Sequence, residues 1–160
     1  MKTLEEMLKD IEHWDRTFDR LMAKSNLSKQ DKYELSNIYV LTRDEIVDSI
    51  IDGTYEWSIP RKVRLKKSGT NRFRIVYIYD IRDRLVLGAL YSILSEYFND
   101  KISDLCYSYK RGVSTQKALT AIKNNKTDEY KYGVKVDIHA YFNSISEDRL
   151  HSMVDEISYH

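Results

Sequence analysis

The sequence has one cysteine, one proline and five glycines among its 160 residues. A single thiol, Cys106, excludes an internal disulfide and favours a reducing compartment. The scarcity of proline and glycine excludes long flexible linkers. No apolar run approaches the roughly 20 residues that a membrane-spanning helix needs, and the acidic, interrupted N-terminus does not resemble a signal peptide. We therefore expect a cytoplasmic protein without a membrane partner.

Neither sign of charge predominates, because 26 lysines and arginines face 25 aspartates and glutamates. The net charge of +1 therefore says nothing about partners, and only the local distribution of charge is informative. The length and the 42% hydrophobic content suffice for a globular protein with a core. The chain ends at HSMVDEISYH, inside an expected helix and without a capping glycine, so we expect a fragment of something longer.

Helices are predicted for the first third of the chain. Residues 3–23 carry apolar side chains at three- and four-residue spacing, which predicts one amphipathic helix. The pairs Ser28 with Asp31 and Thr42 with Glu45 both match the pattern of a capping box or a close relative of it. The second pair predicts the start of a separate short helix, RDEIVDSII, that stops at Gly53.

A β-hairpin is predicted over residues 61–80, where apolar and cationic residues alternate on both sides of the turn sequence SGTN. Residues 61–74 contain no acid and seven cations, which are Arg61, Lys62, Arg64, Lys66, Lys67, Arg72 and Arg74. One interpretation is a solvated edge strand that lysines protect against aggregation. The other is a phosphate site, in which the turn brings Lys66 and Arg72 side by side to bind a triphosphate or a nucleic-acid backbone.

Two further helices are expected after the hairpin. Asp80 precedes the first of them, over residues 81–98, and the second begins at Ser114. Asp80 and Asp83 could be mistaken for metal ligands, but their position at the helix start favours capping and interaction with the helix dipole. The apolar face of the first helix consists of Ile81, Leu85, Ala89, Ile93 and Tyr97.

The segment YKYGVKVDI, residues 130–138, predicts a strand. Its period of two places Asp137 on the exposed face of a sheet, at the C-terminal end of the strand. Taken alone, Asp137 is as well explained by a turn. Together with a cationic phosphate site, it indicates metal-assisted phosphoryl transfer. One carboxylate cannot hold two metal ions, and the chain offers no second acid on a comparable strand end.

Four motifs follow one another at consistent separations: K-x-x-G-x-x-R, D-x-R-D-R, Y-K-R-G-x-S-x-x-x-A-L and V-K-x-D-I-x-x-Y-F-x-S-I. From about Ser58 to Leu150, this succession resembles the N-terminal half of bacterial reverse transcriptases of the retron, group II intron and phage-defence kinds. Intron-encoded members usually read G-F-R-P-G where this chain has S-Y-K-R-G. That departure favours a retron-like or defence-type relative.

The resemblance implies an α+β fold that comprises the fingers and the first part of the palm of a right-hand polymerase. Residues 1–57 would form an N-terminal helical extension, 58–128 the fingers region, and 129–160 the start of the palm with motif A. The second catalytic motif, Y-x-D-D, does not occur in these residues, and neither does a thumb. The chain is thus expected to be inactive alone and to require the remainder of the polymerase chain or a second subunit.

The resemblance also implies roles for individual residues. Asp137 would be the catalytic carboxylate that binds both Mg²⁺ ions of a two-metal site, and Ile138 would offer its backbone carbonyl to one of them. Phe142 would be the steric gate that rejects the 2′-hydroxyl of a ribonucleotide. Lys66 and Arg72 would hold the triphosphate of the incoming dNTP. The RNA template would lie along the next loop, on Tyr109, Lys110, Arg111, Gly112 and Ser114.

The function implied is that of an RNA-directed DNA polymerase, which transfers nucleotides from dNTPs to a DNA or RNA primer. One alternative is a non-catalytic nucleic-acid-binding module that retains the fingers. Another is template-independent DNA synthesis by a phage-defence-type relative. Asp137 and Phe142 argue against a pure binding module, since such a module needs neither.

Overall fold

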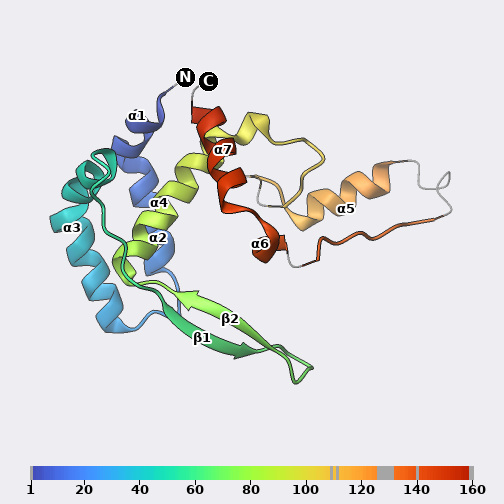
Figure 1. Ribbon diagram of the computed structural model, residues 1–160, viewed down its shortest axis with the longest axis horizontal. Coiled ribbons are helices and arrows are strands. Elements are labelled where there is room, and N and C mark those ends of the chain that lie inside the picture. Colours follow the sequence, from blue (N-terminus) through green and yellow to red (C-terminus); the bar gives the residue numbers. More distant parts are fainter. Residues whose placement is uncertain (1, 109, 111, 126–131, 140, 159–160) are drawn as a thin grey trace. The chain divides into compact units, whose positions relative to one another are not determined.

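The computed structural model describes residues 2–108, 110, 112–125, 132–139 and 141–158, and these form an α+β protein (Figure 1). The chain divides into two compact units, Met1–Lys117 and Ala118–His160. The elements of the first unit are α1 (Leu4–Lys9), α2 (Ile11–Met22), α3 (Lys29–Ile51), β1 (Arg61–Lys66), β2 (Phe73–Ile78), α4 (Ile81–Tyr97) and η1 (Asn99–Lys101). Helix α5 (Thr115–Asn124) crosses the boundary, and α6 (Tyr141–Ser144) and α7 (Glu147–Ser158) follow. Across the described ranges, no helix has the length and apolarity to span a membrane.

The single helix predicted over residues 3–23 is wrong, because Asp10 divides it into α1 and α2. The backbone of Asp10 is extended, with φ −70° and ψ 114°, and its carboxylate accepts a hydrogen bond from the Glu12 N–H at 3.1 Å. The Trp14 indole donates to the Leu8 carbonyl at 2.9 Å, which satisfies an acceptor that the break leaves open. Apolar spacing continues across the break, so the pattern alone does not reveal it.

Helix α3 begins as predicted and then runs further than predicted. Ser28 and Asp31 form the capping box, with hydrogen bonds of 3.0 and 3.1 Å. Thr42 opens no second helix, because its hydroxyl donates to the Ile38 carbonyl at 2.9 Å within one continuous helix. A capping pattern acts as a cap only where the preceding backbone leaves the helix, and no breaker precedes Thr42. The chain leaves α3 through Gly53, at φ +69°.

Helix α4 packs against α1, α2 and α3, so the core of the first unit is helical. Asp80 occupies the N-cap position as predicted, although its side chain makes no capping hydrogen bond. Gly88 faces α2 so closely that a Cβ added to it would lie 2.4 Å from the methyl carbon of the buried Thr17. The predicted apolar face is confirmed by four buried residues, Ile81, Leu85, Ala89 and Ile93, and one partly buried residue, Tyr97.

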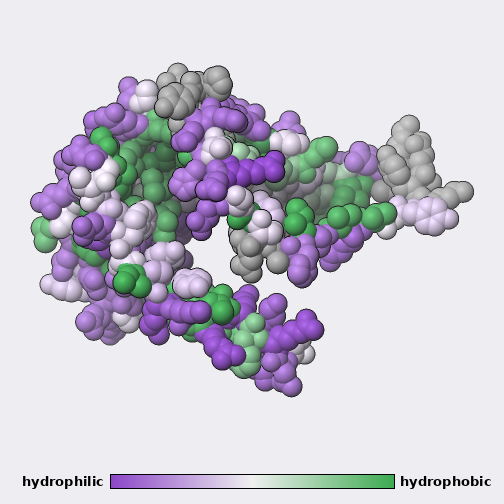
Figure 2. Space-filling model, viewed as in Figure 1, coloured by the Kyte–Doolittle hydropathy of each residue, from purple (hydrophilic) through white to green (hydrophobic). Residues whose placement is uncertain are grey.

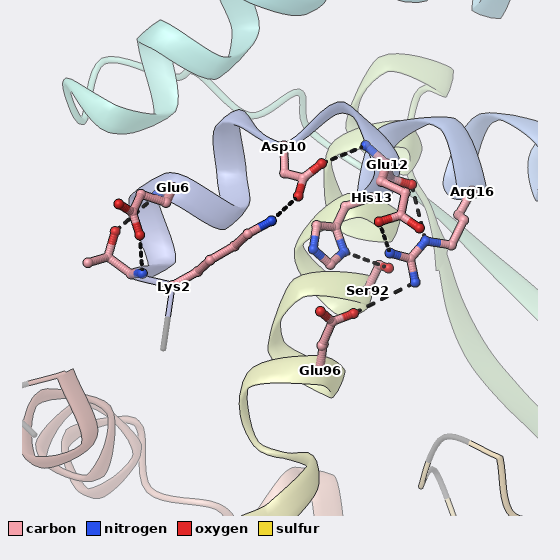
Figure 3. A network of polar contacts seen from close by, with 9 residues as sticks. Lys2, Glu6, Asp10, Glu12, His13, Arg16, Ser92 and Glu96 are labelled. Carbon is pink, nitrogen blue, oxygen red and sulfur yellow. Dashed lines mark hydrogen bonds and ion pairs between the residues drawn. The ribbon is translucent and has the colours of Figure 1, made fainter.

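Polar contacts also join α2 to α4 (Figure 3). The buried ring of His13 places its Nδ1 3.1 Å from the Ser92 hydroxyl oxygen. Arg16 contacts Glu12 at 3.4 Å and Glu96 of α4 at 3.7 Å. Burial lowers the pKa of His13 below its ordinary value, against the opposing influence of Glu96. The neutral imidazole is therefore the form that suits the packed core.

The predicted hairpin is confirmed. Strands β1 and β2 pair antiparallel, from Arg61 opposite Ile78 to Lys66 opposite Phe73. In the described part of the chain, these strands contact each other and no other helix or strand. Figure 1 shows the hairpin extending away from helices α1 to α4. Both of its faces are consequently open to solvent over most of their length.

The strand predicted over residues 130–138 is absent from its described part, 132–138, which has no regular secondary structure. Val134 and Val136 are 88% and 83% exposed, and Asp137 and Ile138 are exposed as well. A strand needs a neighbour to accept and donate its backbone hydrogen bonds. The alternating sequence indicates which side chains a sheet would bury, and it does not supply the neighbouring strand.

Candidate nucleic-acid interface

The register of the hairpin assigns its side chains to two faces, because residues opposite each other on antiparallel strands point to the same side. The aromatic face, as we name it, consists of Lys62, Arg64 and Lys66 on β1 with Tyr77, Ile75 and Phe73 on β2. The aliphatic face consists of Arg61, Val63 and Leu65 on β1 with Ile78, Val76 and Arg74 on β2. Each face therefore combines cations with apolar side chains.

The turn places Lys66 and Arg72 near each other but not opposite. Lys66 pairs with Phe73, and the next backbone N–H, that of Lys67, donates to the Arg72 carbonyl at 2.9 Å. Arg72 thus lies opposite Lys67. Continued alternation assigns Arg72 to the side of the aliphatic face and Lys66 to the aromatic face. Gly69 permits the reversal with its positive φ of +72°.

Among the residues that the structure describes, the hairpin cations have no acidic partners. Within the described ranges, none of the seven cations of residues 61–74 takes part in an ion pair. The guanidinium of Arg64 lies 4.9 Å from the centre of the Phe73 ring, a cation–π contact. Figure 2 shows hydrophilic residues along the hairpin with apolar residues between them. This arrangement gives a positive surface on which a polyanion meets no competing carboxylate.

The base of the hairpin is fixed to α4 by Asp83, for which sequence reasoning predicted a capping role. Asp83 is buried, and its carboxylate accepts hydrogen bonds from the Tyr55 hydroxyl at 2.6 Å and the Ser58 N–H at 2.9 Å. The Ser58 hydroxyl donates to the same carboxylate. Arg82 donates to the Glu56 carbonyl at 2.6 Å. These contacts hold the segment that leads into β1 against the first turn of α4.

The charge on Asp83 is stabilised by its donors. Burial alone would raise the pKa of Asp83, but the hydrogen bonds from Ser58 and Tyr55, with Arg82 nearby, lower the pKa below its usual range. Burial and the contact with Asp83 raise the pKa of the Tyr55 hydroxyl, which keeps it a donor. The burial of Asp83 was not foreseen, because its position lies off the apolar face that the sequence predicted for α4.

The residues expected to form the catalytic centre belong to the second unit. Asp137 and Ile138 are exposed in an irregular segment, and the Phe142 ring lies outside what the structure describes. No group of three histidines, cysteines, aspartates or glutamates able to hold a metal occurs among the described residues. Mg²⁺ is usually held by one or two carboxylates together with phosphate oxygens and waters. Asp137 could supply one such carboxylate, and the other acids of a two-magnesium site would have to come from outside the described residues.

The first template residues predicted from the sequence are partly engaged in their own loop. The Lys110 ammonium donates to the Asp104 carboxylate at 2.8 Å and to the Ile102 carbonyl at 3.1 Å. Its side chain is only 11% exposed. Tyr109 and Arg111 lie outside the described residues. Lys110 thus holds its loop together, and binding of a phosphate would have to displace Asp104.

The last two predicted template residues lie at the start of α5. Gly112 has φ +72°, a conformation that favours glycine, and its carbonyl accepts a hydrogen bond from the Lys117 ammonium at 2.7 Å. The Ser114 hydroxyl accepts one from the Lys117 N–H at 3.3 Å. Both residues therefore stabilise the backbone at the start of α5.

No family model matches the chain, and no curated protein matches its sequence. The order of its motifs and the geometry of the hairpin are therefore the grounds for a functional argument. The hairpin is the described region whose chemistry points most directly to a ligand, since it offers cations and rings together without a carboxylate.

Proposed function

We propose that the chain supplies the fingers and the first palm segment of an RNA-directed DNA polymerase, which extends a DNA or RNA primer along an RNA template with dNTPs. The observation that carries the proposal is the succession of four motifs between Ser58 and Leu150, which includes Asp137 and Phe142 at a separation of five residues. The resemblance implies that the carboxylate would bind magnesium and that the ring would exclude a ribose 2′-hydroxyl.

The geometry of the hairpin supports a role in binding the triphosphate. Lys66 and Arg72 lie on either side of the same turn and are both exposed. An ammonium acts as a point charge and a guanidinium as a fork, and the two suit different oxygens of one triphosphate. The buried Asp83 fixes the base of the hairpin, so the tip is presented by an anchored element.

The exposed apolar side chains of the motif A segment support the idea that the palm sheet is completed by further polypeptide. Val134, Val136 and Ile138 alternate with Lys135 and Asp137, and all three apolar side chains are exposed. A palm sheet from the rest of the polymerase, or from a second subunit, would bury them and supply the missing acids. Magnesium held there would neutralise the charge of the phosphates. We derive no metal-dependent step from the described residues alone.

Primer extension by the protein expressed from its complete reading frame tests the proposal. Asp137→Asn should change the unfolding free energy by no more than about 0.5 kcal/mol, because the side chain is exposed. It should bind primer–template normally and lose extension almost completely. The matched control is Asp155→Asn, another exposed acid of the second unit, which should extend primers like the wild type. Near wild-type extension by Asp137→Asn would overturn the motif A assignment and the polymerase proposal with it.

Two outcomes distinguish the other candidate functions. If the wild-type protein binds nucleic acid but extends no primer, the binding module that the unpaired hairpin cations also allow is favoured. If it incorporates dNTPs equally well without a template, untemplated DNA synthesis replaces the RNA-directed reaction. In either case, Lys66→Ala with Arg72→Ala should weaken the salt dependence of binding, because the slope falls by somewhat less than one for each phosphate that the protein no longer neutralises.

A further inference from the structure

The aromatic face of the hairpin exposes large apolar side chains that a soluble protein normally covers. Phe73, Ile75 and Tyr77 are 53%, 53% and 54% exposed, and they follow one another along one side of β2. On the aliphatic face, Val63 and Val76 are half-buried, and Leu65 and Ile78 are less exposed, at 40% and 38%. Two exposed rings with an exposed isoleucine between them indicate a contact surface rather than a core.

The charges beside these rings identify the chemistry of the partner. Lys62, Arg64 and Lys66 lie opposite Tyr77, Ile75 and Phe73, and the face contains no acid. We propose that the aromatic face is a platform for single-stranded nucleic acid, on which bases stack against Phe73 and Tyr77 while the three cations contact phosphates. This combination of rings and cations is how proteins hold single strands without reading their sequence. The inference rests on the proposed function only in taking the partner to be nucleic acid.

The spacing of the face suits a single strand. Neighbouring residues on one side of a strand are about 6.8 Å apart, which is about twice the 3.4 Å rise per nucleotide along one strand of a duplex. Successive side chains of β2 thus meet every second nucleotide of a stacked strand. The Arg64 guanidinium, 4.9 Å from the Phe73 ring centre, orients that ring and adds a second flat surface. Paired bases in a duplex present no free faces, so the platform discriminates against duplexes.

The platform shares Lys66 with the proposed triphosphate contacts, whereas Arg72 lies on the other side of the hairpin. Arg72 is opposite Lys67, on the side of the aliphatic face. Phe73 and Tyr77 belong to none of the four motifs, and Lys66 is the one residue of the platform within them. A nucleotide held at the turn by Lys66 and Arg72 would therefore meet the platform only at Lys66. Lys66 is left unchanged in the variants below, so that the two sites are tested independently.

Fluorescence anisotropy of the chain with labelled strands tests the platform, without magnesium or dNTP. The probes are oligouridylate of about 12 nucleotides, which falls within the site sizes of such surfaces, an abasic ribose-phosphate strand of the same length, and a blunt RNA duplex. The wild type should bind oligouridylate at least about 30-fold more tightly than the abasic strand, since the two stacked bases together contribute about 2 kcal/mol or more. It should also prefer oligouridylate to the duplex.

Two pairs of variants separate rings from charges. Phe73→Leu with Tyr77→Leu should bind both strands with nearly equal affinity, whereas Phe73→Tyr with Tyr77→Phe, which keeps both rings, should retain the preference. Lys62→Ala with Arg64→Ala should weaken binding to both strands and reduce the salt slope by about 1.4, the value for two phosphates of a single strand. The control, Arg61→Ala with Arg74→Ala, removes the same charge from the aliphatic face and should reduce the slope less.

The outcomes also separate this inference from the polymerase proposal. Equal affinity of the wild type for oligouridylate and the abasic strand overturns the platform, as does a preference that survives both leucine substitutions. Ring-dependent binding to vesicles of anionic phospholipid, without binding to oligouridylate, overturns it in favour of a membrane surface. Asp137→Asn should bind oligouridylate like the wild type. A failure of primer extension alongside an intact base preference would therefore remove the polymerase and leave the platform.

Discussion

Replacement of Gly88 with alanine should destabilise the helical core by about 1 kcal/mol. The new methyl group would lie 2.4 Å from Thr17 Cγ2 and 2.9 Å from a terminal nitrogen of Arg20. The end of the arginine side chain can move aside. Thr17 cannot move as easily, because it is buried and β-branched and has few rotamers available.

Two opposing terms give this magnitude. Forcing an extra methyl into a packed contact costs about 1–3 kcal/mol. Alanine in place of glycine inside a helix contributes about 0.5–1 kcal/mol in the other direction. The middle of each range leaves a loss of about 1 kcal/mol, which corresponds to a melting temperature about 4 °C lower for a unit of this size.

Urea unfolding followed by the fluorescence of the buried Trp14 measures the effect, and a double-mutant cycle assigns its cause. Thr17→Ser removes the carbon at 2.4 Å, so Gly88→Ala in that background should be neutral or slightly stabilising. Gly133→Ala is the control, because no atom lies within 4 Å of its added Cβ. An equal penalty for Gly88→Ala in both backgrounds would refute the clash with Thr17 as its cause.

Three further predictions concern a buried acid, a buried histidine and the sugar gate. Asp83→Asn should lower the free energy of unfolding by about 1–3 kcal/mol near neutral pH, since its donors lose a charged acceptor. Because the folded protein lowers the pKa of Asp83, this loss should shrink as the pH falls below about 3.9. An unchanged loss in acid would contradict this. Burial lowers the pKa of His13, so stability should decline as the pH falls below about 6.5. His13→Gln should flatten that decline in pH-dependent urea unfolding, and an unchanged decline would contradict this. Phe142→Ala in the active protein should raise ribonucleotide incorporation relative to deoxyribonucleotide in steady-state assays, and an unchanged ratio would assign the discrimination to another residue.

Local patterns in the sequence predicted the hairpin and α4 well, because those elements are defined by their own periodicity. The alternation around SGTN fixes two strands and their turn, and the spacing from Ile81 to Ile93 fixes a helical face. The same patterns failed to predict helix ends, because these depend on the backbone conformation before the capping residue. Asp10 and Thr42 are both plausible caps by residue type, yet Asp10 breaks a helix and Thr42 lies inside one.

The candidate site was harder to predict, because it depends on pairing between segments. The number of residues in the turn determines that Arg72 lies opposite Lys67 rather than Lys66, and cation spacing alone does not show this. The aromatic face likewise emerges only when β1 and β2 are aligned. For Asp137, the alternating pattern indicates the side of a sheet, but the described residues offer no neighbouring strand to this segment.

The anchor at Asp83 constrains how this sequence can change over evolutionary time. Ser58 donates its backbone N–H as well as its hydroxyl, so one of its two bonds survives any replacement except proline. Tyr55 contributes only its hydroxyl, and the carboxylate oxygen that accepts it would be left buried if that hydroxyl were removed. Position 58 should therefore tolerate many residues. Positions 55 and 83 should covary, so that an apolar residue at position 55 is accompanied by loss of the acid at position 83.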